Sequence, residues 1–288
     1  MPAARDQPAG AAAPAEHSLD LGGRRLAYLD SGGDHPVLLA LHGHFGRGRL
    51  FTPLARALAG RYRVVAPDQR GHGRSDSASD FTPEGYADDA VALLDALGIG
   101  SAAVLGHSMG GAVAYVLAAR APHRVRALVV SDMTVLNREP ETRPVLDCTG
   151  WPRRAPSRAA LGAAIEAHGI PDAGYFLDSA VAFPDGWGLL FDADDMMASQ
   201  HAFTGDLSAH WRASRQPALL LRAEHSFLLS ETVAQRMVRE RPHTELVTFH
   251  GCGHWLHEDD PDGFARAVGD FLDRVLGREG AGPEPAVP

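Results

Sequence analysis

No lysine occurs anywhere in this chain of 288 residues, so arginine supplies every permanently cationic side chain. Acidic residues outnumber basic ones, 36 against 27, and the formal net charge is −9. This balance argues against nucleic acid or an anionic membrane as the main partner, because both bind clustered positive charge. The absence of lysine, together with the abundant alanine, is typical of a GC-rich bacterial genome. We expect a small-molecule substrate as the partner, and the oligomeric state stays open.

Cysteine is almost absent as well. Cys148 and Cys252 lie far apart and indicate neither a disulfide framework nor a metal site. The H-E-x-x-H motif of a zinc site does not occur, so we expect no metal and no cofactor. The N-terminus lacks the apolar stretch of a secretion signal, and no run is apolar enough to cross a bilayer. These absences predict a cytoplasmic protein with disordered tails at 1–16 and 277–288.

Short apolar runs alternate with helical patterns along the chain. Continuously apolar runs suit strands that are buried on both faces, as in a parallel sheet. The alternation predicts an α/β fold with a doubly wound, mostly parallel sheet and its active groups at the carboxyl ends of the strands. We expect an antiparallel edge at 24–29, further strands at 37–41, 63–66, 102–105, 127–131, 218–222 and 245–249, and helices at 50–58, 83–97, 111–121, 158–168, 231–239 and 262–276.

Residues 134–214 interrupt the alternation with prolines, tryptophans and amphipathic stretches. The economical interpretation is a core formed by 17–133 and 215–276, with 134–214 inserted as a helical lid over the strand ends. Large apolar side chains of the lid line a pocket or attach the lid to the core: Trp151, Tyr175, Phe176, Phe183, Trp187, Phe191, Met196 and Met197. As substrate-binding residues we select Phe45, Trp151, Trp187 and Trp255.

The most informative motif is Gly106-His107-Ser108-Met109-Gly110, between an expected strand and an expected helix. A G-x-S-x-G sequence in this context forms a tight turn that strains the serine backbone and exposes its hydroxyl. The glycines are needed because side chains there would collide with the strand and the helix. We therefore predict that Ser108 is a catalytic nucleophile.

A serine hydroxyl needs a base within hydrogen-bond reach, and that base needs an acid to orient it. His254 follows the last strand in a glycine-rich loop and is our candidate base. The rival is His257, which lies beside Glu258 and Asp259 and is expected on a solvated face. His107 is expected to be a packing or hydrogen-bonding residue.

An oxyanion hole needs two backbone N–H groups that point at one position. Met109, directly after the nucleophile, is expected to supply one of them. The second is expected from the loop after strand 37–41, with His44 as first choice and Phe45 as the alternative.

These residues together resemble the α/β-hydrolase superfamily, in its lidded bacterial serine hydrolase branch. The similarity rests on four pieces in the family's order: His42-Gly43, Asp68–Ser75, Gly106–Gly110 and Gly253-His254. The resemblance implies the α/β-hydrolase fold, and it implies that the segment 68–75 is a structural loop near the site.

The acid departs from the pattern that the resemblance implies. The family's usual aspartate position after the seventh strand is occupied here by Ser226, which cannot hold an imidazolium by charge. Asp132, after strand 127–131, resembles an alternative acid position seen in some branches and is our first choice. Glu224 is the second choice, and a site with no working acid is the third.

The nucleophile also limits the chemistry. Relatives that use aspartate in place of Ser108, the haloalkane dehalogenases and epoxide hydrolases, are excluded. We expect a cofactor-independent hydrolase that cleaves an ester, lactone or thioester, or a carbon–carbon bond beside a ketone, of a medium-sized and fairly hydrophobic substrate. The alternatives are a cofactor-free perhydrolase, lyase or biosynthetic cyclase that uses the same pocket, and a ligand-sensing protein of this fold.

Overall fold

A sheet of eight strands forms the centre of the molecule, in the order β1-β2-β4-β3-β5-β6-β11-β12. The computed structural model describes residues 14–277. From β4 to β12 all neighbours are parallel, whereas β2 pairs antiparallel with both β1 and β4. The expected α/β fold with a mostly parallel sheet is confirmed. The strands are β1 (Ala15–Asp20), β2 (Arg25–Asp30), β3 (Val37–Leu41), β4 (Arg63–Pro67), β5 (Ala102–His107), β6 (Val125–Ser131), β11 (Ala218–Ala223) and β12 (Thr244–Phe249).

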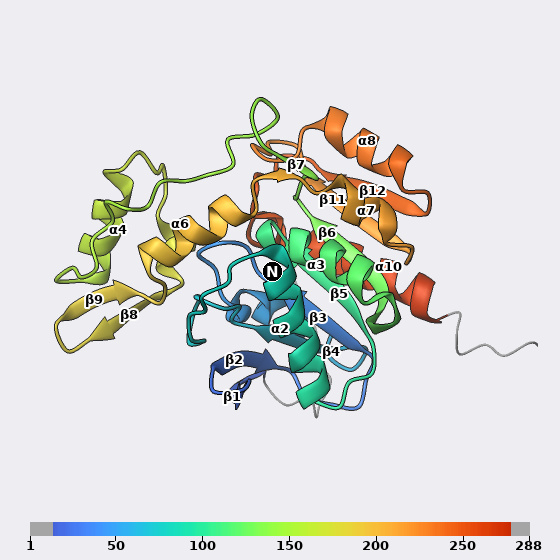
Figure 1. Cartoon of the computed structure of the whole chain (residues 1–288), viewed down its shortest axis with the longest axis horizontal. Helices are drawn as coiled ribbons and strands as arrows, with labels where there is room; N and C mark the ends of the chain where they lie inside the picture. Colours follow the sequence, from blue (N-terminus) through green and yellow to red (C-terminus); the bar gives the residue numbers. More distant parts are fainter. Residues whose placement is uncertain (1–13, 278–288) are drawn as a thin grey trace, which may run out of the picture.

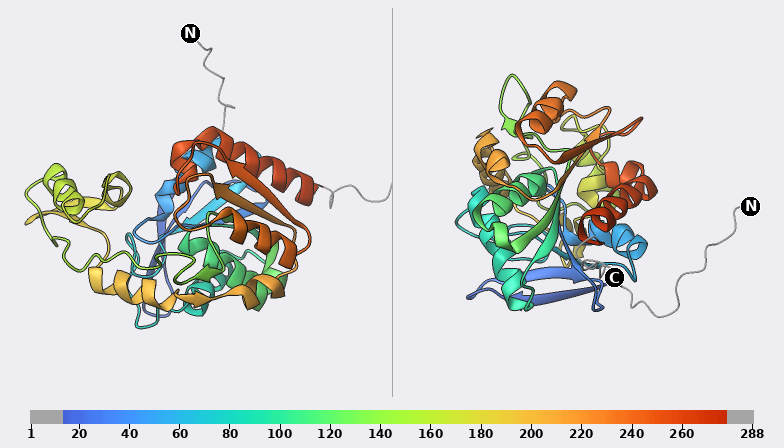
Figure 2. Two further views of the ribbon diagram at one scale, coloured as in Figure 1. Left: turned by 90° about the horizontal axis from the view of Figure 1, so that it is seen from above. Right: turned by 90° about the vertical axis from the view of Figure 1, so that its right-hand side faces the viewer.

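Helices cover both faces of this sheet (Figures 1 and 2). Alternate residues of a strand point to opposite faces, so Leu39 and Leu41 of β3 join one apolar cluster and Leu38 joins the other. The first cluster includes side chains of α2 (Pro83–Ala96), α3 (Met109–Arg120), α7 (Ser208–Ala213) and α8 (Glu231–Glu240), and the second includes side chains of α1 (Thr52–Ala57), α9 (Leu256–Asp259) and α10 (Pro261–Leu276). A short 3-10 helix, η1 (Gly48–Phe51), precedes α1, and η2 (Pro122–Arg124) precedes β6.

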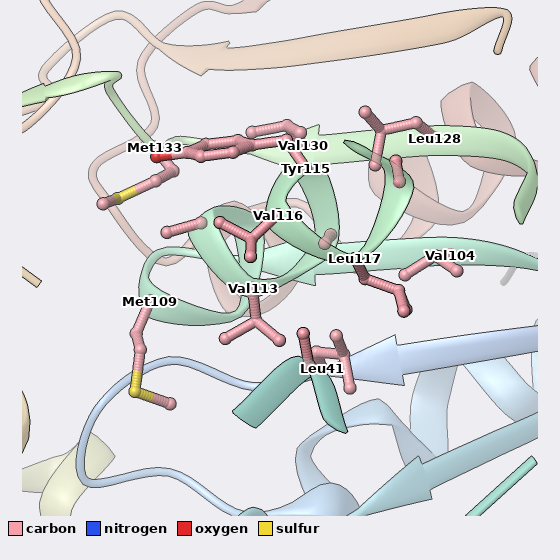
Figure 3. Packing of buried hydrophobic residues seen from close by; sticks show 14 of the residues in the cluster. Leu41, Val104, Met109, Val113, Tyr115, Val116, Leu117, Leu128, Val130 and Met133 are labelled. Atoms are coloured by element: carbon pink, nitrogen blue, oxygen red, sulfur yellow. The ribbon is translucent and has the colours of Figure 1, made fainter. Parts of the chain in front are cut away.

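Helix α3 begins directly after Ser108 and runs through the first apolar cluster. Val113, Val116 and Leu117 pack there with Leu41 and the apolar residues of β5 and β6 (Figure 3). Every residue from Met109 to Ala118 is buried. A helix that is apolar on all sides belongs in a core, and this burial fixes the start of α3 against the sheet.

The segment 134–214, which we call the insertion, connects β6 to β11 at one side of the sheet (Figure 1). It is less helical than expected, because residues 180–189 form the antiparallel hairpin β8–β9 around a Pro184-Asp185 turn. Pro and Asp favour such turns, but strands this short carry little alternation. Its elements are β7 (Leu136–Asn137), α4 (Arg158–Glu166), α5 (Gly174–Leu177), β8 (Ala180–Phe183), β9 (Gly186–Leu189), α6 (Ala193–Ala202), β10 (Gly205–Asp206) and α7.

The ends of the described chain differ slightly from expectation. Strand β1 begins at Ala15, so the last two residues of the expected tail 1–16 belong to the sheet. The rest of that tail before residue 14, and residues 278–288 of the other, lie outside the described residues. No helix within 14–277 combines the length and the apolar character needed to cross a membrane.

Candidate active site

Ser108 lies on the sharp turn between β5 and α3, with φ of 53° and ψ of −126°. A non-glycine residue with positive φ is strained, and such strain is held by the surrounding structure. The Ser108 backbone N–H donates to Ser131 O at 2.9 Å, which ties the turn to β6. A Cβ at Gly106 would lie 2.0 Å from Gly110 O, and one at Gly110 would lie 2.2 Å from Leu41 O. Both glycines are therefore required, and the Ser108 side chain remains partly exposed.

Asp132 stands directly after β6 and is fully buried, also with a positive φ, of 48°. Its carboxylate has three neighbours. Oδ1 accepts from the backbone N–H of Ala223 at 2.9 Å, and Oδ2 lies 2.8 Å from His254 Nδ1. Oδ2 also accepts from the hydroxyl of Ser226 at 2.6 Å. The structure thus brings Asp132 and His254 into direct contact, with the carboxylate held by donors from the last residue of β11 and from the turn that follows it.

Ser226 occupies the position where the resemblance led us to expect an aspartate. Its Oγ accepts from the backbone N–H groups of Leu228 and Leu229, at 3.0 and 2.7 Å, while its hydroxyl donates to Asp132. A serine that accepts two backbone bonds and donates one has its orientation fixed. The side chain in the usual acid position therefore supports a carboxylate supplied by the neighbouring strand.

Glu224, the second candidate acid, lies elsewhere. Its side chain is exposed and accepts from the backbone N–H of Gly251 at 2.8 Å. This bond is the main cause that lowers the pKa of the carboxyl, with a smaller contribution from His250 at 3.4 Å. No contact joins Glu224 to His254 in the described part of the chain. Glu224 does not reach His254 because it lies one residue after β11, where its side chain points outward along the loop that follows β12.

His254 is buried beside the nucleophile turn. Its backbone carbonyl accepts from His107 Nε2 at 2.8 Å, and the centroids of the two rings are 4.7 Å apart. His107 is therefore a hydrogen-bonding residue, as expected. Within 14–277 no hydrogen bond joins Ser108 Oγ to His254. Catalytic hydrogen bonds of this kind often form fully only when substrate is bound.

His257 was expected on a solvated face, and this expectation is wrong. The side chain is buried against Phe51, Phe264 and His107, with ring centroids 5.9, 5.9 and 4.7 Å away. Neither ring nitrogen has a hydrogen-bond partner among the described residues. Burial lowers its pKa to about 3. The helix α9 turns position 257 inward while leaving the acidic residues that follow it exposed.

The loop after β3 lies against Ser108, because a Cβ at Gly43 would be 2.9 Å from Ser108 Cβ. The Gly43 carbonyl accepts from Gly46 N at 3.2 Å and from His42 Nδ1 at 2.8 Å. In a trans peptide the N–H points opposite to the C=O. The N–H of His44 is therefore directed away from the interior of the loop, and no described residue accepts a hydrogen bond from it.

The orientation of that carbonyl depends on the protonation of His42. Its Nε2 accepts from the backbone N–H of Gln69 at 2.9 Å, so the hydrogen of the neutral ring is on Nδ1. Burial lowers the pKa of His42 to about 3, which keeps the ring in this form. On the other side of Ser108, the N–H of Met109 is in the first turn of α3, where helical N–H groups have no acceptor within the helix.

Comparison with known proteins agrees with this architecture. A model of the "Alpha/beta hydrolase family" matches residues 37–267. The chain belongs to this family. It is 29% identical over 268 residues to 2-(acetamidomethylene)succinate hydrolase of Mesorhizobium japonicum, covering 87% of this chain and 93% of that protein. It is 30% identical over 256 residues to 3-hydroxybutyrate-oligomer hydrolase of Cupriavidus necator, covering 80% and 87%. A crystal structure of E-2-(acetamidomethylene)succinate hydrolase superposes with a TM-score of 0.77 at 26% identity, covering 90% and 99%.

Aromatic side chains in this alpha/beta hydrolase fall into two groups. Phe45 and Trp151 are buried against each other, with centroids 5.6 Å apart, and both contact Phe176 and Phe191. Trp187 is half-buried in β9, where its backbone pairs with Ala155. The contact between Phe45 and Trp151 joins the insertion to the core, whereas Trp187 pairs with another residue of the insertion.

The second group surrounds His254. Trp255 lies 5.5 Å from the His254 ring and 5.1 Å from Tyr175, measured between centroids. Phe227, which the sequence did not single out, is 63% exposed and 4.6 Å from the same ring. Phe227 could have been found from the sequence, because it directly follows Ser226, the serine in the usual acid position. No group of three or more His, Cys, Asp or Glu side chains within 14–277 is arranged to hold a metal ion.

Proposed function

We propose that this alpha/beta hydrolase is a cofactor-independent serine hydrolase that cleaves an ester, lactone or thioester through an acyl-enzyme on Ser108. The observation that carries the proposal is the 2.8 Å contact between Asp132 and His254, buried beside the strained turn that presents Ser108. A buried carboxylate on the imidazole Nδ1 keeps the hydrogen there and leaves Nε2 free to accept a proton.

In this mechanism Ser108 Oγ attacks the carbonyl carbon while His254 Nε2 takes the hydroxyl proton. The negative charge that develops on the carbonyl oxygen is stabilised by the backbone N–H groups of His44 and Met109. The intermediate then expels the alcohol or thiol, which receives the proton from His254. A water molecule repeats the sequence on the acyl-enzyme, and the carboxylic acid leaves. The carboxylate of Asp132 stabilises the imidazolium that forms on His254.

The substrate class follows from the surroundings of His254. The exposed ring of Phe227 and the half-buried ring of Trp255 present apolar area at this side of the site. We infer a small-molecule substrate of medium size and fairly hydrophobic character. The names of the two relatives denote hydrolysis, in one case of an oligomeric hydroxybutyrate. We also propose that the insertion is a lid, because its aromatic residues pack against Phe45 at the edge of the site.

The proposal is tested by labelling the protein with a fluorophosphonate and locating the label by mass spectrometry. Turnover of p-nitrophenyl esters from acetate to octanoate is measured in parallel. We expect label on Ser108, and Ser108→Ala and His254→Ala should each lower kcat by about 10⁵-fold or more. Ser208→Ala, which changes a buried serine on α7, is the matched control. A wild-type protein that is neither labelled nor active on esters, lactones or thioesters would refute the proposal and favour the ligand-sensing alternative.

A further inference from the structure

One buried hydroxyl of the insertion contacts both residues that are proposed to supply the oxyanion hole. Ser199 lies on α6 and is fully buried. Its Oγ is 3.0 Å from His44 Nε2 and 3.8 Å from the sulfur of Met109. A third contact, at 2.8 Å, joins it to the hydroxyl of Tyr86 on α2. The insertion is thus hydrogen-bonded to three separate pieces of the core, the loop after β3, α2 and α3, through a single side chain.

The three contacts use the full capacity of the Ser199 hydroxyl, which has one hydrogen and two lone pairs. All three are satisfied when its hydrogen points to Met109 Sδ and its oxygen accepts from the His44 ring and from Tyr86, whose hydroxyl then gives up its longer bond, of 3.4 Å, to Arg70 O. Burial, with a smaller effect of His72, lowers the pKa of His44 well below its usual range. In that arrangement the neutral ring carries its hydrogen on Nε2 and donates it to Ser199 Oγ.

Two further side chains of the insertion hold the same loop. The Tyr175 hydroxyl donates to the His44 carbonyl at 3.1 Å, and Ser179 Oγ donates to the Phe45 carbonyl at 2.8 Å. Phe45 has a φ of 68°, a strained conformation for a residue with a side chain. A loop in this conformation needs restraint from its surroundings, and the hydrogen bonds come from α5, α6 and the residue before β8.

We propose that Ser199 is a positioning residue for the oxyanion hole, which is assembled fully only when α6 is seated on the core. The inference rests on the proposed function and deepens it. By holding the His44 ring and the Met109 side chain at once, Ser199 sets the separation of the two backbone N–H groups that face the developing anion. An error of about 1 Å in such a position can cost a large factor in rate.

The test compares Ser199→Ala with Ser208→Ala, a buried serine of the same insertion that contacts neither oxyanion residue. We expect Ser199→Ala to lower kcat about tenfold with KM changed less than about twofold, because the lost interaction acts only in the transition state. The rate of fluorophosphonate labelling and the affinity for a trifluoromethyl ketone analogue should fall by a similar factor. Ser208→Ala should change none of these quantities.

Tyr86→Phe keeps the aromatic ring and removes one hydrogen-bond partner of Ser199. If Ser199→Ala does not fold, this variant tests the positioning role of Ser199 in its place. It should lower kcat by a smaller factor, and the double variant should be no slower than Ser199→Ala alone. The inference is overturned if the folded Ser199→Ala protein, or Tyr86→Phe in its place, matches Ser208→Ala in kcat and labelling rate. An inactive, unlabelled wild type would instead overturn the proposed function.

Discussion

Replacing Asp132 by asparagine changes one atom and tests the arrangement of the site most directly. If the new amide keeps its oxygen toward Ala223 N–H, its NH₂ group faces His254 Nδ1. Nδ1 must then accept, so the hydrogen of the ring moves to Nε2, which can no longer take the proton of Ser108. If the amide is flipped, its NH₂ meets the N–H of Ala223, and two donors face each other.

The expected size of the effect follows from losing the correct tautomer and the carboxylate charge together. We expect kcat to fall by roughly 10³–10⁴, which is about 4–5.5 kcal/mol of transition-state stabilisation. KM should change little, because Asp132 is buried and does not face solvent. The measurement is steady-state kinetics on the p-nitrophenyl ester that the wild type cleaves best, with a thermal melt to show that the variant is folded.

Glu224→Gln is the matched control, since it removes the charge of the other candidate carboxylate without removing its side chain. Its contact is with Gly251 N–H rather than with the imidazole, so near-full activity is expected. Near-full turnover in Asp132→Asn combined with loss of turnover in Glu224→Gln would refute the reasoning and reverse the assignment of the acid.

Three further predictions concern residues around His254. Ser226→Ala removes a hydrogen bond to Asp132 and should cost about 1–3 kcal/mol in urea unfolding, with kcat lowered about threefold to tenfold. His257 has a folded pKa of about 3 against an ordinary 6.5, so the unfolded state binds the proton first and stability falls as pH drops from 6.5 toward 3. His257→Leu should retain activity and reduce that loss by up to about 1.4 kcal/mol per pH unit in unfolding measured at pH 7, 6 and 5. Phe227→Ala should raise KM for the octanoate ester about threefold to tenfold and leave the acetate unchanged.

Each of these has a result that contradicts it. Unchanged stability and kcat in Ser226→Ala would show that the hydroxyl is not needed to hold the carboxylate. If His257→Leu loses as much stability as the wild type between pH 7 and pH 5, then other buried histidines are the groups that take up the proton on unfolding. For the exposed aromatic ring of Phe227 the control is Val247→Ala, a change at an exposed apolar residue on β12. An equal effect of the two changes on octanoate would remove Phe227 from the substrate site.

The sheet was predictable because its parallel strands are continuous apolar runs, which burial on both faces requires. Strand β1 lacks that signal, since most of Ala15–Asp20 is exposed and only its pairing with β2 makes it a strand. The packing of α7, at the end of the insertion, also left no signal in the sequence. Trp211 is fully buried against α3, with its ring 6.1 Å from Tyr115, so α7 packs as part of the core. Long-range pairing and packing of this kind leave little trace in a local pattern.

At the site, the nucleophile motif could be recognised from five consecutive residues. For the acid, the sequence left two candidate carboxylates. Asp132 and Glu224 both follow strands at the same edge of the sheet. Which carboxylate reaches His254 depends on the positive φ of Asp132 and on the turn held by Ser226. Both are properties of the assembled loops. The same holds for His257, whose orientation is set by a helix of four residues that is too short to show a period.

The order of the site residues along the chain has a practical consequence. The nucleophile, the proposed acid and the anion-binding loop all precede the insertion, and only the base follows it. A chain divided between β7 and α4 would therefore yield two fragments, neither of which holds a complete set of reactive groups. Because β11 pairs with β6 over Ala218–Leu221, reassociation of the fragments would restore the sheet and the base in one step. Ester turnover by the reassembled fragments would then measure whether two proteins, one fused to each fragment, bind each other.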